Sequence, residues 1–287
     1  MVAAFKILRD VLVERLRKRE MANLAGAVSI MLVLGLPGPE MGVRVLFATL
    51  LNVLVYLNND YCDVEFDLYA PGKDWQKARF LRANMGAAVA AQVALVMALT
   101  VLATWWDPGL FIALIVGGGI CWAYSARLKH MPGVDVAAMI IWGVTMPLTG
   151  VPIERVLGWW LVLQLGLFSG VFESIQVLRD RVEDRTLGVQ TTAVALGQRR
   201  TLALIRALAL LAAGFMIATL DIWAGLLVAS AAVLPCRRGQ VPQYWDRVRV
   251  IFGVAWLVAC ARIYLAGASD GLLVSIPVTA GIPAWIS

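Results

Sequence analysis

Residues 41–67 read MGVRVLFATLLNVLVYLNNDYCDVEFD, an apolar run that ends in a cluster of acidic side chains. A helix needs about 20 mostly apolar residues to cross the roughly 30 Å hydrocarbon core of a bilayer. Residues 41–58 come close to that length, and the acids follow directly. The stretch therefore predicts a membrane-spanning helix that carries carboxylates at one end.

The composition of the whole chain agrees with a lipid solvent. Its 287 residues are 61% hydrophobic and 15% charged, with a mean hydropathy of +0.78. Soluble domains average about 45–50% apolar and about 25% charged residues. These values exclude most soluble enzymes and DNA-binding proteins, so we read the net charge of +6 as a sign of orientation in the membrane and expect no nucleic-acid partner. The single histidine excludes sites that need several histidines, and the four scattered cysteines show no metal-binding spacing.

Apolar stretches of similar length recur along the chain. We predict an all-α integral membrane protein in which nine transmembrane helices form one domain over residues 21–270. A basic, amphipathic segment at 1–20 precedes the domain, and an apolar tail at 271–287 follows it. The predicted spans are 22–37, 41–58, 83–104, 108–125, 134–152, 156–178, 201–219, 221–236 and 248–268.

The basic residues predict the orientation of this bundle. The N-terminal segment and the connectors after even-numbered spans hold 21 of the 25 lysines and arginines. Basic loops stay on the cytoplasmic side of a membrane. We therefore expect a multi-pass protein of the inner or plasma membrane whose N-terminus faces the cytoplasm. Two arginines, Arg44 and Arg262, lie within spans, and we expect them to extend toward the interface or to bind an acceptor carboxylate.

Two acidic clusters lie at the cytoplasmic ends of the second and sixth spans. In the first cluster, Asn59, Asp63 and Asp67 recur every four residues and are expected on one helix face, with Asp60 beside Asp63. The second cluster contains Asp180 and Asp184, again four residues apart. Like charges at this spacing repel each other, so a positive partner should compensate them.

Magnesium ions are suited to this compensation. Mg²⁺ takes oxygen ligands and typically binds one or two carboxylates together with substrate phosphates. Two facing carboxylate helices can hold two such ions around one diphosphate, and nearby bases can bind the remaining phosphate oxygens. The candidate bases are Lys73, Lys77, Arg79, Arg127, Lys129 and Arg179.

These motifs resemble the signatures of the UbiA superfamily of intramembrane prenyltransferases. Residues 59–67 match its NDxxDxxxD motif in full, and residues 180–184 match its DxxxD motif. The stretches 188–197 and 124–129 resemble its Gly-x-x-Thr…Gly continuation and a shortened form of its Tyr-Ser…Arg-Leu-Lys loop. The Arg-Pro pair that follows the first motif in many members is absent from residues 73–79, which indicates a divergent member.

The resemblance implies a polyprenyl diphosphate donor, a hydrophobic or aromatic acceptor, and an allylic carbocation that the lipid-embedded bundle shields from water. It implies metal binding by Asn59, Asp63, Asp180 and Asp184, and catalytic roles for Asp60, Asp67, Tyr124 and Glu173. Glu173 lies seven residues before Asp180, two turns deeper on the same face, where it can orient the acceptor, act as a base or pair with a polar neighbour.

Three alternative functions would also place acidic clusters in a membrane protein. A UbiA-type terpene cyclase would ionise the same diphosphate without a separate acceptor, and activity in the absence of acceptor would identify it. A CDP-alcohol phosphotransferase is disfavoured because its DG…AR…G…D…D run is absent. A cation-coupled transporter is disfavoured because transporter sites lie near the bilayer midplane, whereas these acids lie at one membrane face beside bases.

Overall fold

Helices make up all the regular secondary structure of the described residues, which are 2–17, 22–69, 74–237 and 239–267 of a computed structural model. The α-helices are α1 (Val2–Arg17), α2 (Ala22–Val33), α3 (Gly38–Asp67), α4 (Trp75–Ala83), α5 (Met85–Trp105), α6 (Leu110–Ile112), α7 (Gly119–Ala126), α8 (Val134–Thr145), α9 (Val156–Thr186), α10 (Thr192–Thr219), α11 (Ile222–Ser230) and α12 (Val241–Leu265). Short helices of other types complete the bundle, namely η1 (Ala113–Gly118), η2 (Leu128–His130), η3 (Pro147–Gly150) and η4 (Ala231–Val233).

The predicted all-helical fold is confirmed, and each predicted span falls on an apolar helical segment. Within the described residues, α3, α5, α9, α10 and α12 are long and apolar enough to cross a membrane. The other four spans fall on the shorter apolar segments Asn23–Val33, Leu110–Ala126, Val134–Gly150 and Ile222–Val233. The count of nine crossings and the cytoplasmic N-terminus therefore stay predictions, and the tail at 271–287 lies outside the described residues.

The two longest helices, α3 and α9, are the ones that carry the acidic motifs. They contain 30 and 31 residues. At 1.5 Å per residue each is about 45 Å long, roughly 15 Å more than a hydrocarbon core requires. The motifs occupy the C-terminal ends of these helices, so the carboxylates lie on the part that a bilayer core does not need to enclose.

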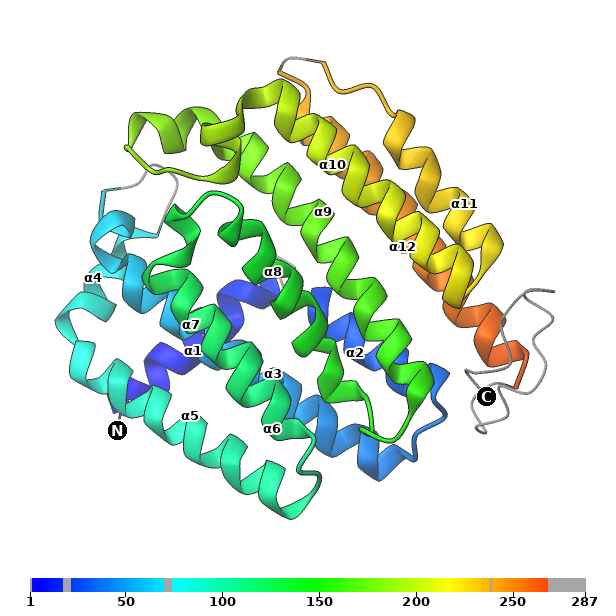
Figure 1. The fold of residues 1–287 in the computed structure, drawn as a ribbon. Helices are drawn as coiled ribbons and strands as arrows, with labels where there is room; N and C mark the ends of the chain where they lie inside the picture. The colour runs from blue at the N-terminus through cyan, green and yellow to red at the C-terminus, as the bar shows by residue number, and fades with distance from the viewer. Residues whose placement is uncertain (1, 18–21, 70–73, 238, 268–287) are drawn as a thin grey trace.

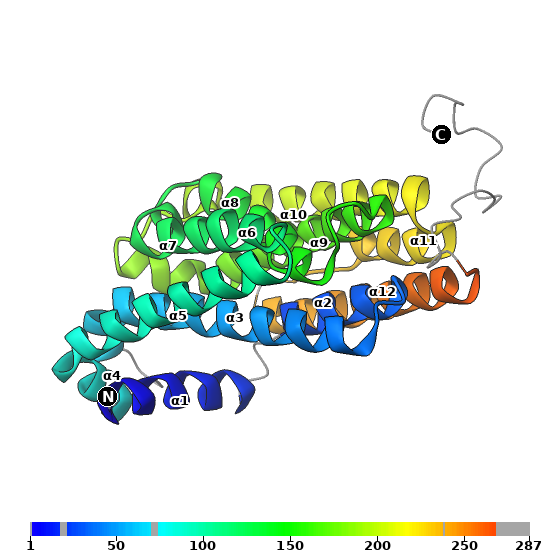
Figure 2. The same cartoon turned by 90° about the horizontal axis from the view of Figure 1, so that it is seen from below.

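Each motif helix also lies in its own hydrophobic cluster. Buried side chains of α3 pack with those of α1, α5, α6 and α7, whereas buried side chains of α9 pack with those of α2, α10, α11 and α12. Figure 1 shows the long helices running side by side, with α1 crossing their direction. In Figure 2, α1 lies outside the bundle beneath α3 and α5, and it packs against both helices.

Residues Val2–Arg17 of the N-terminal segment form the helix α1. Its apolar residues Ile7 and Val11 are buried, at 4% and 1% exposed. Because α1 contacts α3 and α5, this apolar face packs on the bundle itself. Arg15 of α1 is thereby brought to Asp60 of the first motif.

Small residues let α8 and α9 approach closely. A Cβ atom on Gly143 would overlap Ser169, and one on Gly166 would overlap Val144. The Ser169 hydroxyl donates a hydrogen bond of 2.7 Å to the Met139 carbonyl oxygen across the same interface. Such close backbone packing is typical of helix pairs in membranes, and it holds the middle and the C-terminal end of α8 against α9.

Arg44 is buried at 2% exposure instead of extending to the interface. Its guanidinium pairs with Glu40 at 2.9 Å and with Asp107 at 2.5 Å, and it donates to the carbonyl oxygens of Thr149 and Val151. A buried charge is tolerated only when it is paired and hydrogen-bonded. The sequence showed the arginine but not these partners, which come from its own helix and from two other segments.

Candidate active site

The first motif is divided between two faces of α3. On one face, Asn59 Oδ1 accepts a hydrogen bond of 3.3 Å from the Ser125 hydroxyl, and the Asp63 carboxylate pairs with the Lys129 ammonium. Ser125 belongs to α7 and Lys129 to η2, so this face of α3 is turned toward the connector between α7 and α8. Both partners come from one short stretch of chain, which therefore organises this half of the motif.

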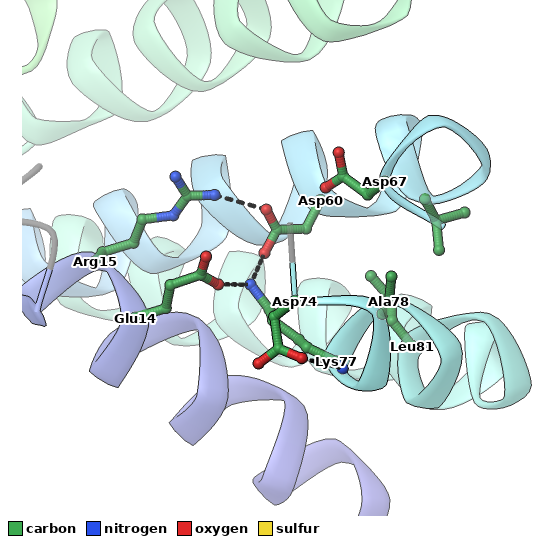
Figure 3. A pocket seen from close by; sticks show the side chains of 9 residues that line it. Glu14, Arg15, Asp60, Asp67, Asp74, Lys77, Ala78 and Leu81 are labelled. Atoms are coloured by element: carbon green, nitrogen blue, oxygen red, sulfur yellow. Dashed lines mark hydrogen bonds and ion pairs between the residues drawn. The ribbon is translucent and has the colours of Figure 1, made fainter. Parts of the chain in front are cut away.

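The other face of α3 is turned toward α1 and α4. The buried Asp60 pairs with Arg15 of α1 at 2.6 Å and with Lys77 of α4 at 2.5 Å. Lys77 pairs in addition with Glu14, so one chain of alternating charges joins the three helices (Figure 3). Burial disfavours the charged ammonium, but the Asp60 and Glu14 carboxylates outweigh it and hold the pKa of Lys77 above its ordinary value. We call Glu14, Arg15, Asp60 and Lys77 the N-terminal clasp.

Asp67 lies with Asp60 and not with Asn59 and Asp63. Together with Asp74 it lines the pocket between α1, α3 and α4 that Figure 3 shows. The structure therefore corrects the expectation that Asn59, Asp63 and Asp67 share one helix face. Eight residues advance about 80° beyond two full helical turns, whereas the seven from Asp60 to Asp67 fall about 20° short of two turns.

The second motif is held mainly by neighbours in its own sequence. Asp180 accepts hydrogen bonds of 2.7 and 3.0 Å from the adjacent Arg179. Asp184 accepts one of 3.1 Å from the hydroxyl of Thr191, at the start of α10. Between Asp184 and Thr191 the chain turns back at Gly188, whose φ of 74° lies in the left-handed region that glycine adopts without strain.

The connector from Tyr124 to His130 lies between the two motifs. In addition to its bonds with the first motif, its Tyr124 hydroxyl donates to Glu173 at 2.8 Å. Glu173 is 8% exposed and belongs to α9. Of the roles considered for Glu173, pairing with a polar neighbour is therefore observed. The connector contacts residues of both motif helices through Tyr124, Ser125 and Lys129.

The candidate bases are not all gathered at one place. Lys129 and Arg179 contact motif carboxylates, and Lys77 belongs to the N-terminal clasp. Arg127 is exposed, and so is Arg79, whose guanidinium lies 4.9 Å from the centre of the Trp75 ring. Lys73 lies outside the described residues.

Several residues of the site have no motif signal in the sequence. Glu14 and Arg15 are ordinary members of the amphipathic N-terminal helix. Ser125 and Thr191 were visible only as parts of the loop and continuation stretches. Asp135, which is fully buried and binds Thr192, is one acid in an apolar span. The sequence indicates Asp135 only through the free-energy cost of a carboxylate in an apolar span, which requires polar partners.

The described acidic side chains do not form a metal site by themselves. Within the described part of the chain, three or more His, Cys, Asp or Glu side chains do not converge in a way that could hold a metal ion. Paired carboxylates are nevertheless the usual protein contribution to a Mg²⁺ site, because phosphate oxygens and water complete the six ligands. The oxygen donors on α3 and α9 therefore fit an Mg²⁺–diphosphate complex better than a metal held by protein alone.

Comparison with known proteins identifies the family. A model of the UbiA prenyltransferase family matches residues 24–248. The chain is 28% identical over 172 residues to a 4-hydroxybenzoate octaprenyltransferase from Xanthomonas euvesicatoria pv. vesicatoria (strain 85-10), covering 53% of this chain and 55% of that protein. A protein of the same description from Xanthomonas oryzae pv. oryzae (strain PXO99A) is 28% identical over 169 residues, covering 52% and 54%. The chain thus spans about half the length of the relatives it matches.

Solved structures show the same fold. A digeranylgeranylglyceryl phosphate synthase superimposes with a TM-score of 0.70 at 17% identity, covering 89% of this chain and 99% of that one. A UbiA homologue from Archaeoglobus fulgidus bound to GPP and Mg²⁺ has a TM-score of 0.63 at 14% identity, covering 90% and 99%. The family match extends over most of the sequence and the fold agrees with it along nearly the whole described length, so the chain is an integral membrane protein that belongs to the UbiA prenyltransferase family.

Proposed function

We propose that the protein transfers a polyprenyl group from an isoprenyl diphosphate to an aromatic acceptor. One observation carries the proposal: a connector contacts the Asn59–Asp63 pair on α3 and Glu173 on α9, the helix that carries Asp180 and Asp184, and it contributes a lysine. The 4-hydroxybenzoate octaprenyltransferases among its relatives support an aromatic acceptor, and the GPP-bound homologue supports a prenyl diphosphate donor.

Asn59 and Asp63 on α3, with Asp180 and Asp184 on α9, are the residues that would hold two Mg²⁺ ions. When bound, Mg²⁺ supplies positive charge that neutralises the diphosphate as it leaves. Lys129 already lies at Asp63 and provides a further positive charge beside the leaving group, and Arg127 and Arg179 extend the same basic surface. Lys77 is engaged by Asp60 and Glu14, and we assign it to holding α4 and α1 on the motif helix.

In the proposed reaction the C–O bond to the diphosphate breaks and leaves an allylic cation. A ring carbon of the acceptor attacks the cation, and the ring then loses a proton. Glu173, which is buried on α9 seven residues before Asp180, would accept that proton, with the Tyr124 hydroxyl orienting its carboxylate. The surrounding apolar helices exclude water, which would otherwise capture the cation.

The positive-inside distribution of lysine and arginine supports an active site that faces the cytoplasm. Labelling of single cysteines by a membrane-impermeant thiol reagent tests this orientation on a background that lacks the four native cysteines. A cysteine at exposed Arg127 should react only when the reagent has access to the cytoplasmic side. Reaction from the opposite side alone would contradict the proposed orientation.

Turnover assays test the function and separate it from a cyclase. Purified protein in lipid is supplied with Mg²⁺ and geranyl, farnesyl or geranylgeranyl diphosphate, first alone and then with phenolic acids and quinols. The proposal expects diphosphate release and a prenylated adduct only when an acceptor is present. A Mg²⁺-dependent cyclic hydrocarbon or alcohol formed without acceptor would replace the transferase by a cyclase. Absence of EDTA-sensitive diphosphate binding would overturn both.

A further inference from the structure

Asp135, in the first turn of α8, is fully buried and receives three hydrogen bonds. The backbone N–H groups of Val136 and Thr192 donate to its carboxylate at 2.8 and 2.7 Å, and the Thr192 hydroxyl donates as well. The Thr192 hydroxyl oxygen accepts in turn from the Gly133 N–H at 2.6 Å. The start of α8 and the start of α10 are therefore joined by a closed set of bonds.

The charge of this carboxylate is balanced without a basic side chain. In the ranges that the structure describes, no lysine or arginine forms an ion pair with Asp135. Instead it lies at the N-terminal ends of two helices, α8 and α10, where the unpaired N–H groups and the helix dipole favour a negative charge. An amide in its place would lose this attraction and would present N–H groups to donors.

The residue beside Thr192 reaches the second motif. Thr191 donates its hydroxyl to Asp184 at 3.1 Å. Because Thr191 and Thr192 are adjacent, fixing Thr192 on Asp135 also fixes the place from which Thr191 reaches Asp184. The position of a motif carboxylate thus depends on an acid outside both motifs.

The same stretch of chain reaches the first motif. Lys129 pairs with Asp63 only six residues before Asp135. The sequence from Lys129 to Asp135 is therefore anchored on α3 at one end and on α10 at the other. A continuous path of bonds runs from Asp63 through Lys129, Asp135 and the two threonines to Asp184, and the close glycine packing of α8 on α9 supports it.

We propose that Asp135 is a positioning residue that sets the separation of the two acidic motifs. It does not touch substrate. It holds the start of α10, and through it Asp184, at the distance from Asp63 at which one Mg²⁺–diphosphate complex contacts both motif helices. This inference rests on the proposed function, because the complex whose binding it controls is the prenyl donor.

Binding of an unreactive donor analogue tests the proposal without turnover. The full-length protein in detergent is titrated calorimetrically with the thiolo analogue of geranyl diphosphate, with Mg²⁺ and with EDTA. We expect D135N to weaken Mg²⁺-dependent binding by about 10-fold or more, since outer partners of metal ligands typically contribute 10–100-fold. T186V is the matched control, because the Thr186 hydroxyl bonds only to the carbonyl oxygen of Glu183 on its own helix, and it should bind like wild type.

A second variant keeps the test valid if D135N lowers stability. T191V preserves side-chain shape and removes only the last bond of the path, so it should weaken binding by several-fold while the melting temperature stays at the wild-type value. Effects of residues on one path are not additive, so the D135N/T191V double variant should bind little more weakly than D135N alone.

The outcomes separate the two proposals. Wild-type affinity in both D135N and T191V, with binding by the wild-type protein intact, would overturn the positioning role and leave the proposed function standing. Strictly multiplicative effects in the double variant would also overturn it, because the two residues would then act independently. Absence of Mg²⁺-dependent binding by the wild-type protein would overturn the proposed function together with this inference.

Discussion

The two acidic motifs end equivalent helices, yet they are held in opposite ways. Charges on the first motif are matched by bases from α1, α4 and η2, which lie far away in sequence. Charges on the second are matched by Arg179 next to Asp180 and by Thr191, seven residues after Asp184. The first motif therefore holds the fold together, whereas the second can be altered with less effect on the rest of the molecule.

Burial explains the difference. The side chain of Asp60 is 6% exposed, so an unpaired charge there would lose its hydration with no compensation. The side chain of Asp180 is 37% exposed and remains partly solvated, which makes its ion pair weak and dispensable for stability. The contrast can be tested by comparing activity and stability in the same variants.

The largest expected effect is on activity and is common to both motifs. D63A and D180A should each lower turnover by on the order of 100-fold or more while the protein remains folded, because each removes an oxygen ligand from the diphosphate site. The controls are E65Q and E183Q, which change exposed acids within the same two clusters. Full activity of either alanine variant would remove the two-motif mechanism.

The next effect distinguishes the motifs by stability. D60A leaves Arg15 and Lys77 without their buried carboxylate, and breaking a buried pair in this way costs about 3–5 kcal/mol. D180A removes a partly exposed pair and should cost no more than about 1 kcal/mol. Denaturant titration in detergent compares the two free energies of unfolding. Equal losses would contradict the division of roles between the motifs.

A smaller effect tests whether α1 takes part in the site. R15Q removes one charged hydrogen bond to Asp60 and should cost about 2 kcal/mol of stability. R9Q, on the exposed part of the same helix, should cost less than about 0.5 kcal/mol. Thermal unfolding of the two variants gives the comparison. If R15Q unfolds at the temperature of R9Q, the clasp does not stabilise the first motif.

The smallest expected effect is on the stability contributed by the surface ion pairs of Asp10 on α1, for comparison with the N-terminal clasp. Slight burial raises the pKa of Asp10, but hydrogen bonds from Lys6 and Arg9 outweigh it and lower that pKa below its ordinary value of 3.8. The stabilisation is therefore present above the unfolded pKa and is lost as the pH falls through the folded one. D10N should cost about 0.5 kcal/mol at pH 7 and nothing near pH 2. A cost that grows on acidification would contradict the sign.

The helices and the motifs were predictable because their signals are local. Apolar runs of sufficient length and acids spaced by four residues depend only on nearby sequence. The face of Asp67 was predicted wrongly because a spacing of eight was treated as two full turns. Each step of four residues adds about 40° of rotation around the helix. Asn59 and Asp63 therefore still lie on one face, whereas Asp67 lies on the face of Asp60.

The partners of the buried acids were not predictable, because they depend on packing between distant segments. Arg15 is 45 residues from Asp60, and Glu14 is 63 residues from Lys77. Many bases in the sequence are equally plausible partners, and nothing in it ranks Arg15 above Arg9 or Arg17. The same holds for Asp135. The sequence shows that an acid lies in an apolar span and needs polar partners, but it does not identify Thr192 as the partner.

The N-terminal clasp also constrains the order in which the protein can mature during synthesis. Arg15 leaves the ribosome 45 residues before Asp60, and Lys77 follows Asp60 by a further 17. Until α4 has been made, Glu14 lacks its lysine and Asp60 has only one of its two bases. Helix α1 therefore acquires its full attachment only after α3 and α4 have entered the nascent bundle, so it reaches its final place later than its position before them in the chain suggests.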